Sequence, residues 1–179
     1  MSPGRDIARR LGLEGGRILK RALEHVGTRC MVCGRALRGT LPDACCPGCA
    51  HALRPRSGGF CPVCGEPYAS QEEPVSLCGP CRLGGKPWSG FGMYAEYSGV
   101  FRGAIVAFKY RADFGYLRLL RSCLLRAQQL HGTGAGCGIV VPVPLHSRRL
   151  RQRGFNQSLE LCRPLAPRLG AELRPRALS

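Results

Sequence analysis

The sequence predicts an α/β domain that follows a small module held together by metal ions. Two observations lead to this fold class. Cysteines in regularly spaced pairs fill residues 30–81, where apolar periodicity is absent. Helical and strand patterns then alternate from Trp88 onward, as they do in α/β units. A chain of 179 residues is long enough for one ordinary domain and such a module.

The N-terminal segment, residues 1–29, is basic and amphipathic. Apolar residues recur at helical spacing over residues 5–26, with a break at Gly15 and Gly16, which predicts one or two short helices. The segment has no unbroken apolar core with a cleavage site, so we do not expect it to be a signal peptide. The sequence also has no run of about 18 apolar residues. We therefore expect no membrane span and a cytoplasmic protein.

The cysteine pairs indicate metal binding, because regularly spaced cysteines in a reducing compartment are metal ligands more often than disulfides. Each Cys-x-x-Cys pair forms a tight turn that points two thiolates at one ion. Two such pairs close a tetrahedral site with no open position, so we expect two structural Zn²⁺ sites. The predicted ligands are Cys30, Cys33, Cys46, Cys49, Cys61, Cys64, Cys78 and Cys81.

Two features of the zinc sites stay open at this point. Sequential pairing of the cysteine pairs is the preferred arrangement, and a cross-braced arrangement is the alternative. Cys45 competes with Cys46, but only Cys46 keeps the Cys-x-x-Cys spacing. Outside the pairs, Cys137 has no partner at ligand spacing, while Cys123 and Cys162 lie among apolar helical positions and should act as small hydrophobic residues.

The α/β part begins with a predicted strand over residues 91–97, where aromatic and small residues alternate. Apolar spacing then predicts a helix over residues 100–108 and another over residues 117–127. The glycine-rich stretch 131–138 ends the second helix. It follows a helix and precedes a strand, so it is a connection and not a phosphate-binding loop.

An arginine-rich segment lies between the next strand and the next helix. Residues 139–143 predict a strand. Pro142 and Pro144 end its hydrogen-bonded part and make the segment that follows it rigid. Asn156 is a good N-cap for the following helix, whose positive end faces the arginines. Prolines further along that helix predict that it is short or kinked. Ligands bind at the carboxyl ends of strands in open α/β sheets, so this segment is a candidate site.

The charge of the chain agrees with an anionic ligand. The formal net charge is +16, and residues 82–179 hold 16 basic and 4 acidic residues, a net charge of +12. Nucleic acid and phosphorylated metabolites are the ligands that such a charge favours. Forked guanidinium groups suit phosphate or pyrophosphate, and a solvated basic turn is the alternative.

Lys109 either reaches the same phosphate or only complements the end of its helix. The arginines of the segment are Arg148, Arg149, Arg151 and Arg153, followed by Gly154, which allows close approach of the backbone or a positive φ.

The cysteine pairs, the stretch AFKYRADFG (107–115) and the stretch VVPVPLHSRRLRQRGFNQS (140–158) together resemble the ComF family, the competence-protein-F-like phosphoribosyltransferases. The resemblance implies a double zinc ribbon over 30–84 and an incomplete type I phosphoribosyltransferase-like domain over 85–179. In that fold, the loop after the first core strand helps to hold the pyrophosphate of phosphoribosyl pyrophosphate (PRPP). The resemblance and the charge pattern together give these candidate phosphate-binding residues: Pro142, Pro144, Arg148, Arg151, Arg153, Gly154, Phe155, Asn156, Gln157 and Lys109.

The family is linked to natural transformation. The resemblance therefore implies single-stranded DNA, PRPP or another phosphorylated sugar, and competence-machinery proteins as partners. The acidic PRPP loop of the fold has no counterpart before Ser179, so we expect a fragment of a longer protein or a truncated paralogue that does not itself catalyse phosphoribosyl transfer. No catalytic residue is assigned. The alternative is a non-enzymatic zinc-ribbon protein that binds single-stranded DNA or serves as an adaptor.

Overall fold

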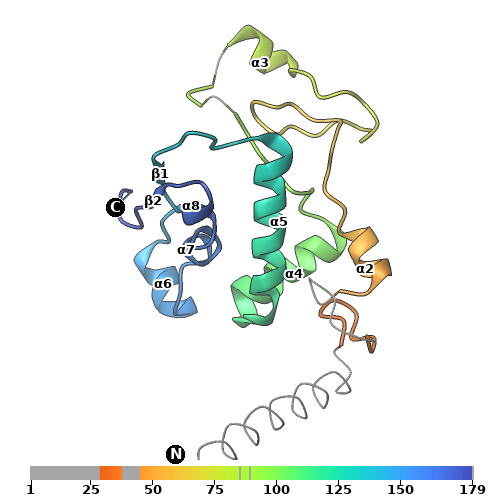
Figure 1. Ribbon diagram of the computed structural model, residues 1–179, viewed down its shortest axis with the longest axis vertical. Helices are drawn as coiled ribbons and strands as arrows, with labels where there is room; N and C mark the ends of the chain where they lie inside the picture. The colour runs from red at the N-terminus through yellow and green to blue at the C-terminus, as the bar shows by residue number, and fades with distance from the viewer. Residues whose placement is uncertain (1–28, 38–44, 85, 89, 179) are drawn as a thin grey trace, which may run out of the picture. The chain divides into compact units, whose positions relative to one another are not determined.

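The protein is represented by a computed structural model (Figure 1), which describes residues 29–37, 45–84, 86–88 and 90–178. The helices expected before residue 29 lie outside the described residues.

The chain divides into two compact units, residues 1–49 and 50–179, and each is described by itself. In the first unit, the backbone N–H of Gly34 donates to the carbonyl of Cys30 (2.8 Å), which closes a tight turn around the first cysteine pair. Gly34 has φ 74°, a left-handed conformation that glycine adopts without steric cost. Buried Cys30 packs with Leu37 and Cys46 in a small apolar cluster.

The second unit repeats this turn at its start. The N–H of Gly65 donates to the carbonyl of Cys61 (2.8 Å), and Gly65 has φ 78°. Helix α2 (Pro47–Ala52) and helix α3 (Gly79–Leu83) each follow a cysteine directly, and each has a proline in its first turn, where the missing N–H has no helical partner to lose.

Buried Arg56 joins the second ribbon to the segment that leads into the next helix. Its side chain is 3% exposed, and it donates to the carbonyls of Gly58, Gly59 and Tyr68 and to the carboxylate of Glu96. The Arg56 charge is therefore fully hydrogen-bonded, as a buried charge requires. These bonds hold the ribbon loop against the residues just before helix α4.

Helices α4 (Gly99–Arg111) and α5 (Gly115–His131) confirm the two helices predicted from apolar spacing. Helix α4 buries Ala104, Ala107 and Phe108, and α5 buries Leu120 and other apolar side chains. Helix α5 packs against both α4 and α7 (Gln157–Cys162).

The predicted strand over residues 91–97 is wrong, since the structure has no strand there. The polar groups of Tyr94 bond instead to a loop: its hydroxyl donates to the carbonyl of Leu53 (2.6 Å), and its carbonyl accepts from the N–H of Arg56 (2.7 Å). Alternating aromatic residues here anchor an irregular segment to that loop, and periodicity alone does not distinguish the two cases.

Strands β1 (Ile139–Val140) and β2 (Glu172–Leu173) form a parallel pair, with Ile139 opposite Glu172 and Val140 opposite Leu173. Strand β1 is shorter than predicted, and Pro142, which has no N–H to donate, follows closely. Helix α8 (Leu165–Arg168) packs on both strands, and α7 joins it to α5, so the elements run from α5 to the sheet in Figure 1. A strand, helices and a parallel strand in this order make an α/β unit, as predicted.

The interruption predicted for the helix after Asn156 is also present. Helix α7 ends at Cys162, and α8 begins at Leu165 after Pro164.

Candidate functional site

The eight predicted zinc ligands lie in two separate groups of four. The first group is Cys30, Cys33, Cys46 and Cys49, and the second is Cys61, Cys64, Cys78 and Cys81. Within each group, all sulfur atoms lie within 4.8 Å of one another. The sequential pairing is therefore the one that the structure brings together, and the cross-braced arrangement is not.

The spacing of the sulfur atoms fits a zinc ion. Tetrahedral Zn–S bonds of about 2.3 Å place two sulfur ligands roughly 3.8 Å apart. The Sγ atoms of Cys33 and Cys46 are 3.7 Å apart, and those of Cys64 and Cys78 are 3.6 Å apart. Each group could thus hold one Zn²⁺ in a closed site of four thiolates, the donor set of structural zinc.

Ionisation of the thiols also suits metal binding. Burial alone would raise the pKa of Cys30, but hydrogen bonds, chiefly from backbone groups, outweigh it and lower that pKa to about 6. The N–H of Cys46 donates one of these bonds, with 3.3 Å between N and Sγ. Cys61 has the same balance of causes, and its pKa is also about 6. Burial and the neighbouring sulfur atoms raise the pKa of Cys49, and they raise that of Cys81 to about 12.

The other cysteines lie outside these groups. Cys45 is buried beside Cys46 and is a member of neither group. Cys123 is buried on α5, and burial raises the pKa of Cys162 on α7. The latter two occupy the apolar helical positions expected of small hydrophobic residues.

The sequence suggested that the arginine-rich segment is a loop. The structure shows instead that it contains helix α6 (Ser147–Arg153). The Nδ1 atom of His146 accepts from the N–H of Arg148 (3.2 Å) and caps the first turn. Gly154 ends the helix with φ 77°, and its N–H donates to the carbonyl of Leu150 (2.8 Å). Leu150 is the one apolar residue of the helix, so apolar periodicity could not reveal it.

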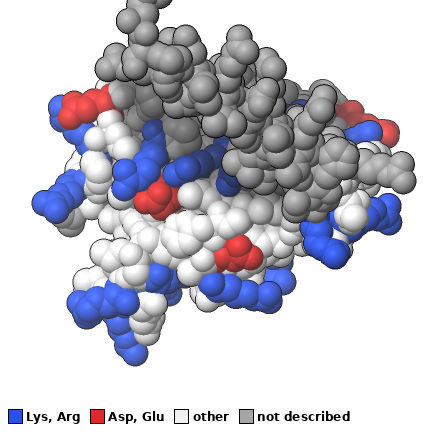
Figure 2. Space-filling model, turned by 60° about the horizontal axis from the view of Figure 1, so that its bottom comes forward, with Lys and Arg blue, Asp and Glu red and all other residues white. Residues whose placement is uncertain are grey.

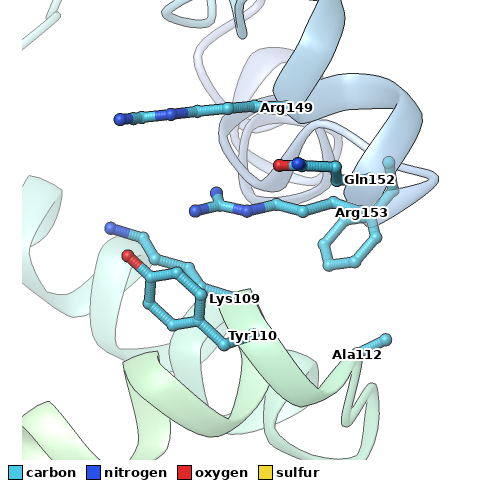
Figure 3. Close-up of a pocket in the computed structure, with 7 residues that line it drawn as sticks. Lys109, Tyr110, Ala112, Arg149, Gln152 and Arg153 are labelled. Atoms are coloured by element: carbon cyan, nitrogen blue, oxygen red, sulfur yellow. The ribbon is translucent and has the colours of Figure 1, made fainter.

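Helix α6 and the end of α4 line a cavity of about 300 Å³ (Figure 3). Cationic side chains come from both helices, and in Figure 3 the long side chains of Lys109, Arg149 and Arg153 extend toward the same side of the opening. Among the described residues, no Asp or Glu lines the cavity. The lining residues are Lys109, Tyr110, Ala112, Arg149, Gln152, Arg153 and Phe155.

Arg153 is held in place from two sides. Its guanidinium carbon lies 4.8 Å from the centroid of the Tyr110 ring, within the range of a cation–π contact. Its Nη1 donates to Oε1 of Gln157 (2.9 Å). The remaining guanidinium donors are free of these two contacts and can serve a ligand, so the geometry suits an anion.

Aromatic packing holds the end of α6 beside the cavity. The ring of Phe155 lies 5.1 Å from that of Phe108 and 4.8 Å from that of Phe114, between centroids. Phe108 is 1% exposed, so this cluster ties the end of α6 to the buried face of α4. Phe155 therefore sets the position of the end of α6 relative to α4, which carries Lys109.

The structure brings three of the predicted phosphate-binding residues to the cavity: Lys109, Arg153 and Phe155. Gln157 contributes through Arg153. Asn156 caps α7, because its Oδ1 accepts from the N–H groups of Ser158 (2.9 Å) and Leu159 (3.4 Å), which confirms the predicted N-cap.

The other predicted residues lie elsewhere. Pro142 is fully buried, Pro144 is exposed, and Arg148 and Arg151 are exposed outside the cavity lining. Gly154 ends α6 and has the positive φ that the sequence suggested.

Tyr110, Gln152 and Ala112 line the cavity but were not predicted, and Arg149 was not singled out from the other arginines. A helical reading of residues 147–153 would have found two of them, because positions 149, 152 and 153 share one helix face.

These features define a class of protein: mixed helices with a small parallel sheet, two four-cysteine groups of the zinc-ribbon kind, and a cationic cavity. Across the part of the chain that the structure describes, no helix is both long and apolar enough to cross a membrane.

The chain is similar to curated proteins named DNA utilization protein YhgH. The relative from Salmonella typhimurium is 34% identical over 128 residues, which cover 70% of this chain and 55% of the relative. The relative from Escherichia coli K12 is 34% identical over 125 residues, which cover 68% and 53%. The chain thus spans about half the length of the curated relatives it matches. No protein-family model and no solved structure matches the chain.

Proposed function

We propose that the chain is ComF-like and that its cationic cavity binds the pyrophosphate of PRPP or of a similar phosphorylated sugar. One observation carries the proposal: Lys109, Arg149 and Arg153 line one cavity whose described lining has no acidic side chain. Three cationic groups from two helices suit a pyrophosphate, which has charged oxygens on two linked phosphates, better than they suit a single phosphate.

The proposed cellular role is the handling of DNA in competence. The name of the relatives, DNA utilization protein, supports this role. The two four-cysteine groups would hold structural Zn²⁺, since each offers four thiolates and no open position for a substrate. We assign no catalytic step to the chain. Binding of the sugar pyrophosphate is the proposed activity.

Isothermal titration calorimetry tests the ligand class. The zinc-loaded chain is titrated with PRPP, inorganic pyrophosphate and ribose 5-phosphate. We expect PRPP and pyrophosphate to bind more tightly than ribose 5-phosphate, because only they carry two linked phosphates. The variant Lys109→Gln should weaken the binding of both ligands by roughly ten- to hundredfold, since a charge-assisted bond contributes about 1.5–3 kcal/mol. Equal affinity for all three ligands would contradict a pyrophosphate site.

The second candidate is a zinc-ribbon protein that binds single-stranded DNA through its arginines. Exposed Arg148 and Arg151 outside the cavity favour it, because they are open to a nucleic-acid backbone. Backbone binding weakens steeply with salt, with a slope near −0.7 per neutralised phosphate for single strands. Arg148→Gln and Arg151→Gln should lower the affinity for an oligothymidine and leave pyrophosphate binding intact. This result would show that DNA binding and pyrophosphate binding use different arginines.

A further inference from the structure

Helix α4 has an exposed stripe whose composition is unusual for a solvated helix face. Residues 102, 103, 106 and 110 lie within one side of the helix, because positions three and four apart are neighbours. Arg102, Gly103 and Tyr110 are exposed, and Val106 is half-buried. The opposite side carries the buried Ala104, Ala107 and Phe108. The stripe is therefore the solvent side of α4, and the two residues in its middle, Gly103 and Val106, are small.

An aromatic ring with an arginine beside it lies at each end of this stripe. Before the helix, Tyr97 is 56% exposed, and the guanidinium carbon of Arg102 is 5.7 Å from its ring centroid. At the other end, Tyr110 is 70% exposed, with Arg153 4.8 Å from its ring centroid. Gly99 and Tyr110 are eleven residues apart, which corresponds to about 16 Å along a helix. Two exposed aromatic rings, each with an arginine against it, thus flank the small residues Gly103 and Val106.

The charge of the surroundings selects the class of ligand. Neither α4 nor α6 contains an acidic residue, whereas α4 has Arg102, Lys109 and Arg111. Residues 50–178 hold 18 Lys and Arg against 7 Asp and Glu, a net charge of +11. Lys and Arg side chains lie at several places on the face drawn in Figure 2, with few Asp and Glu among them. A polyanion is the complementary partner.

We propose that this α4 surface, defined as Tyr97, Arg102, Gly103, Val106 and Tyr110, binds a single strand of nucleic acid by stacking its bases. Exposed aromatic rings in a basic surface are the features that bind single strands without sequence preference, because every base has a π-face. Small residues between the two rings leave room for the strand. The surface ends at Tyr110 on the edge of the cationic cavity, so a phosphate of the same strand reaches the cavity. The inference rests on the proposed role in DNA handling but not on recognition of a phosphorylated sugar.

Fluorescence anisotropy of a labelled oligothymidine with the zinc-loaded full chain tests this surface at fixed salt. Tyr97→Leu should weaken binding by about tenfold and Tyr97→Phe should not, because phenylalanine keeps the stacking face. Tyr97 lies outside the cavity lining, so Tyr97→Leu should bind pyrophosphate like the wild type. Arg102→Gln should weaken binding more than Arg176→Gln, which removes the same charge from an exposed residue elsewhere.

Several results would overturn the inference. One is that Tyr97→Leu binds the oligothymidine with wild-type affinity; if its self-association is also altered, the surface serves protein contacts. Another is that Arg102→Gln and Arg176→Gln lose equal affinity for the oligothymidine. If Tyr97→Leu lost the binding of both the oligothymidine and pyrophosphate, a separate base-binding surface would be excluded. Tyr97-dependent binding of the oligothymidine by a chain that does not bind pyrophosphate would support this surface and reject the proposed sugar-pyrophosphate site.

Discussion

The guanidinium of Arg153 lies over the ring of Tyr110, and the two side chains come from different helices, α6 and α4. This contact, with the bond from Arg153 to Gln157, fixes an arginine that would otherwise be a mobile surface side chain. The position of the cationic group in the cavity therefore depends on the side chain of Tyr110.

Tyr110→Leu should lower the affinity for pyrophosphate by about two- to fivefold, because an exposed cation–π contact contributes about 0.5–1 kcal/mol. Tyr110→Phe keeps the ring and should bind like the wild type. Titration calorimetry of the two variants separates the ring from the hydroxyl. Equal losses in both variants would show that the hydroxyl, and not the ring, serves the ligand.

Cys46→Ser should reduce the zinc content of the purified chain from two ions to one, because each group needs all four thiolates for a closed site. Cys45→Ala is the matched control: the residue is adjacent and buried but belongs to neither group, so two ions should remain. Zinc is counted by a colorimetric chelator after denaturation. Loss of one ion in Cys45→Ala, with two retained in Cys46→Ser, would reverse the ligand assignment.

Zinc binding at pH 7.5 should release fewer than four protons per group. Cys30 and Cys61 have pKa values lowered to about 6, so at pH 7.5 these thiols have lost their protons before the metal arrives. Cys49 and Cys81 have raised pKa values and should each lose a proton only when zinc binds. As the pH falls below 6, Cys30 and Cys61 become protonated and the number released should rise. Calorimetry in buffers with different ionisation enthalpies counts the protons, and a constant four per group from pH 5.5 to 7.5 would contradict these pKa values.

Arg56→Met should lower the free energy of unfolding by about 3 kcal/mol or more, because it leaves buried carbonyls and a carboxylate without their donor. Glu96→Gln should cost about 1 kcal/mol or less, since Glu96 is 45% exposed and glutamine still accepts a hydrogen bond. Urea unfolding of the zinc-loaded chain measures both. A larger loss for Glu96→Gln than for Arg56→Met would contradict the network described around the guanidinium.

The elements that the sequence predicted correctly depend on local chemistry. The cysteine pairs form their groups through spacing, Asn156 caps α7 through its own side chain, and α4 and α5 follow from apolar periodicity. Each of these signals lies within one element or, for the cysteine groups, within about twenty residues of the chain.

The missed features depend on contacts between distant segments. Residues 91–97 resemble a strand, but Tyr94 bonds to a loop some forty residues earlier in the chain. Helix α6 has too little apolar surface to be recognised and is fixed by Phe155, whose ring packs on Phe108. Tyr110 joins the candidate site only because α6 comes to lie beside α4. Tertiary packing decides such features, and periodicity does not report it.

The central claim is that a specific cavity, and not the general positive charge, binds a pyrophosphate. Two double variants remove the same charge from the same helix: Arg149→Gln with Arg153→Gln inside the cavity, and Arg148→Gln with Arg151→Gln outside it. Titration of inorganic pyrophosphate into each zinc-loaded variant is the most direct measurement. We expect at least a tenfold loss of affinity in the first double variant and less than about twofold in the second. Equal losses in the two variants, or no binding by the wild type, would contradict the claim.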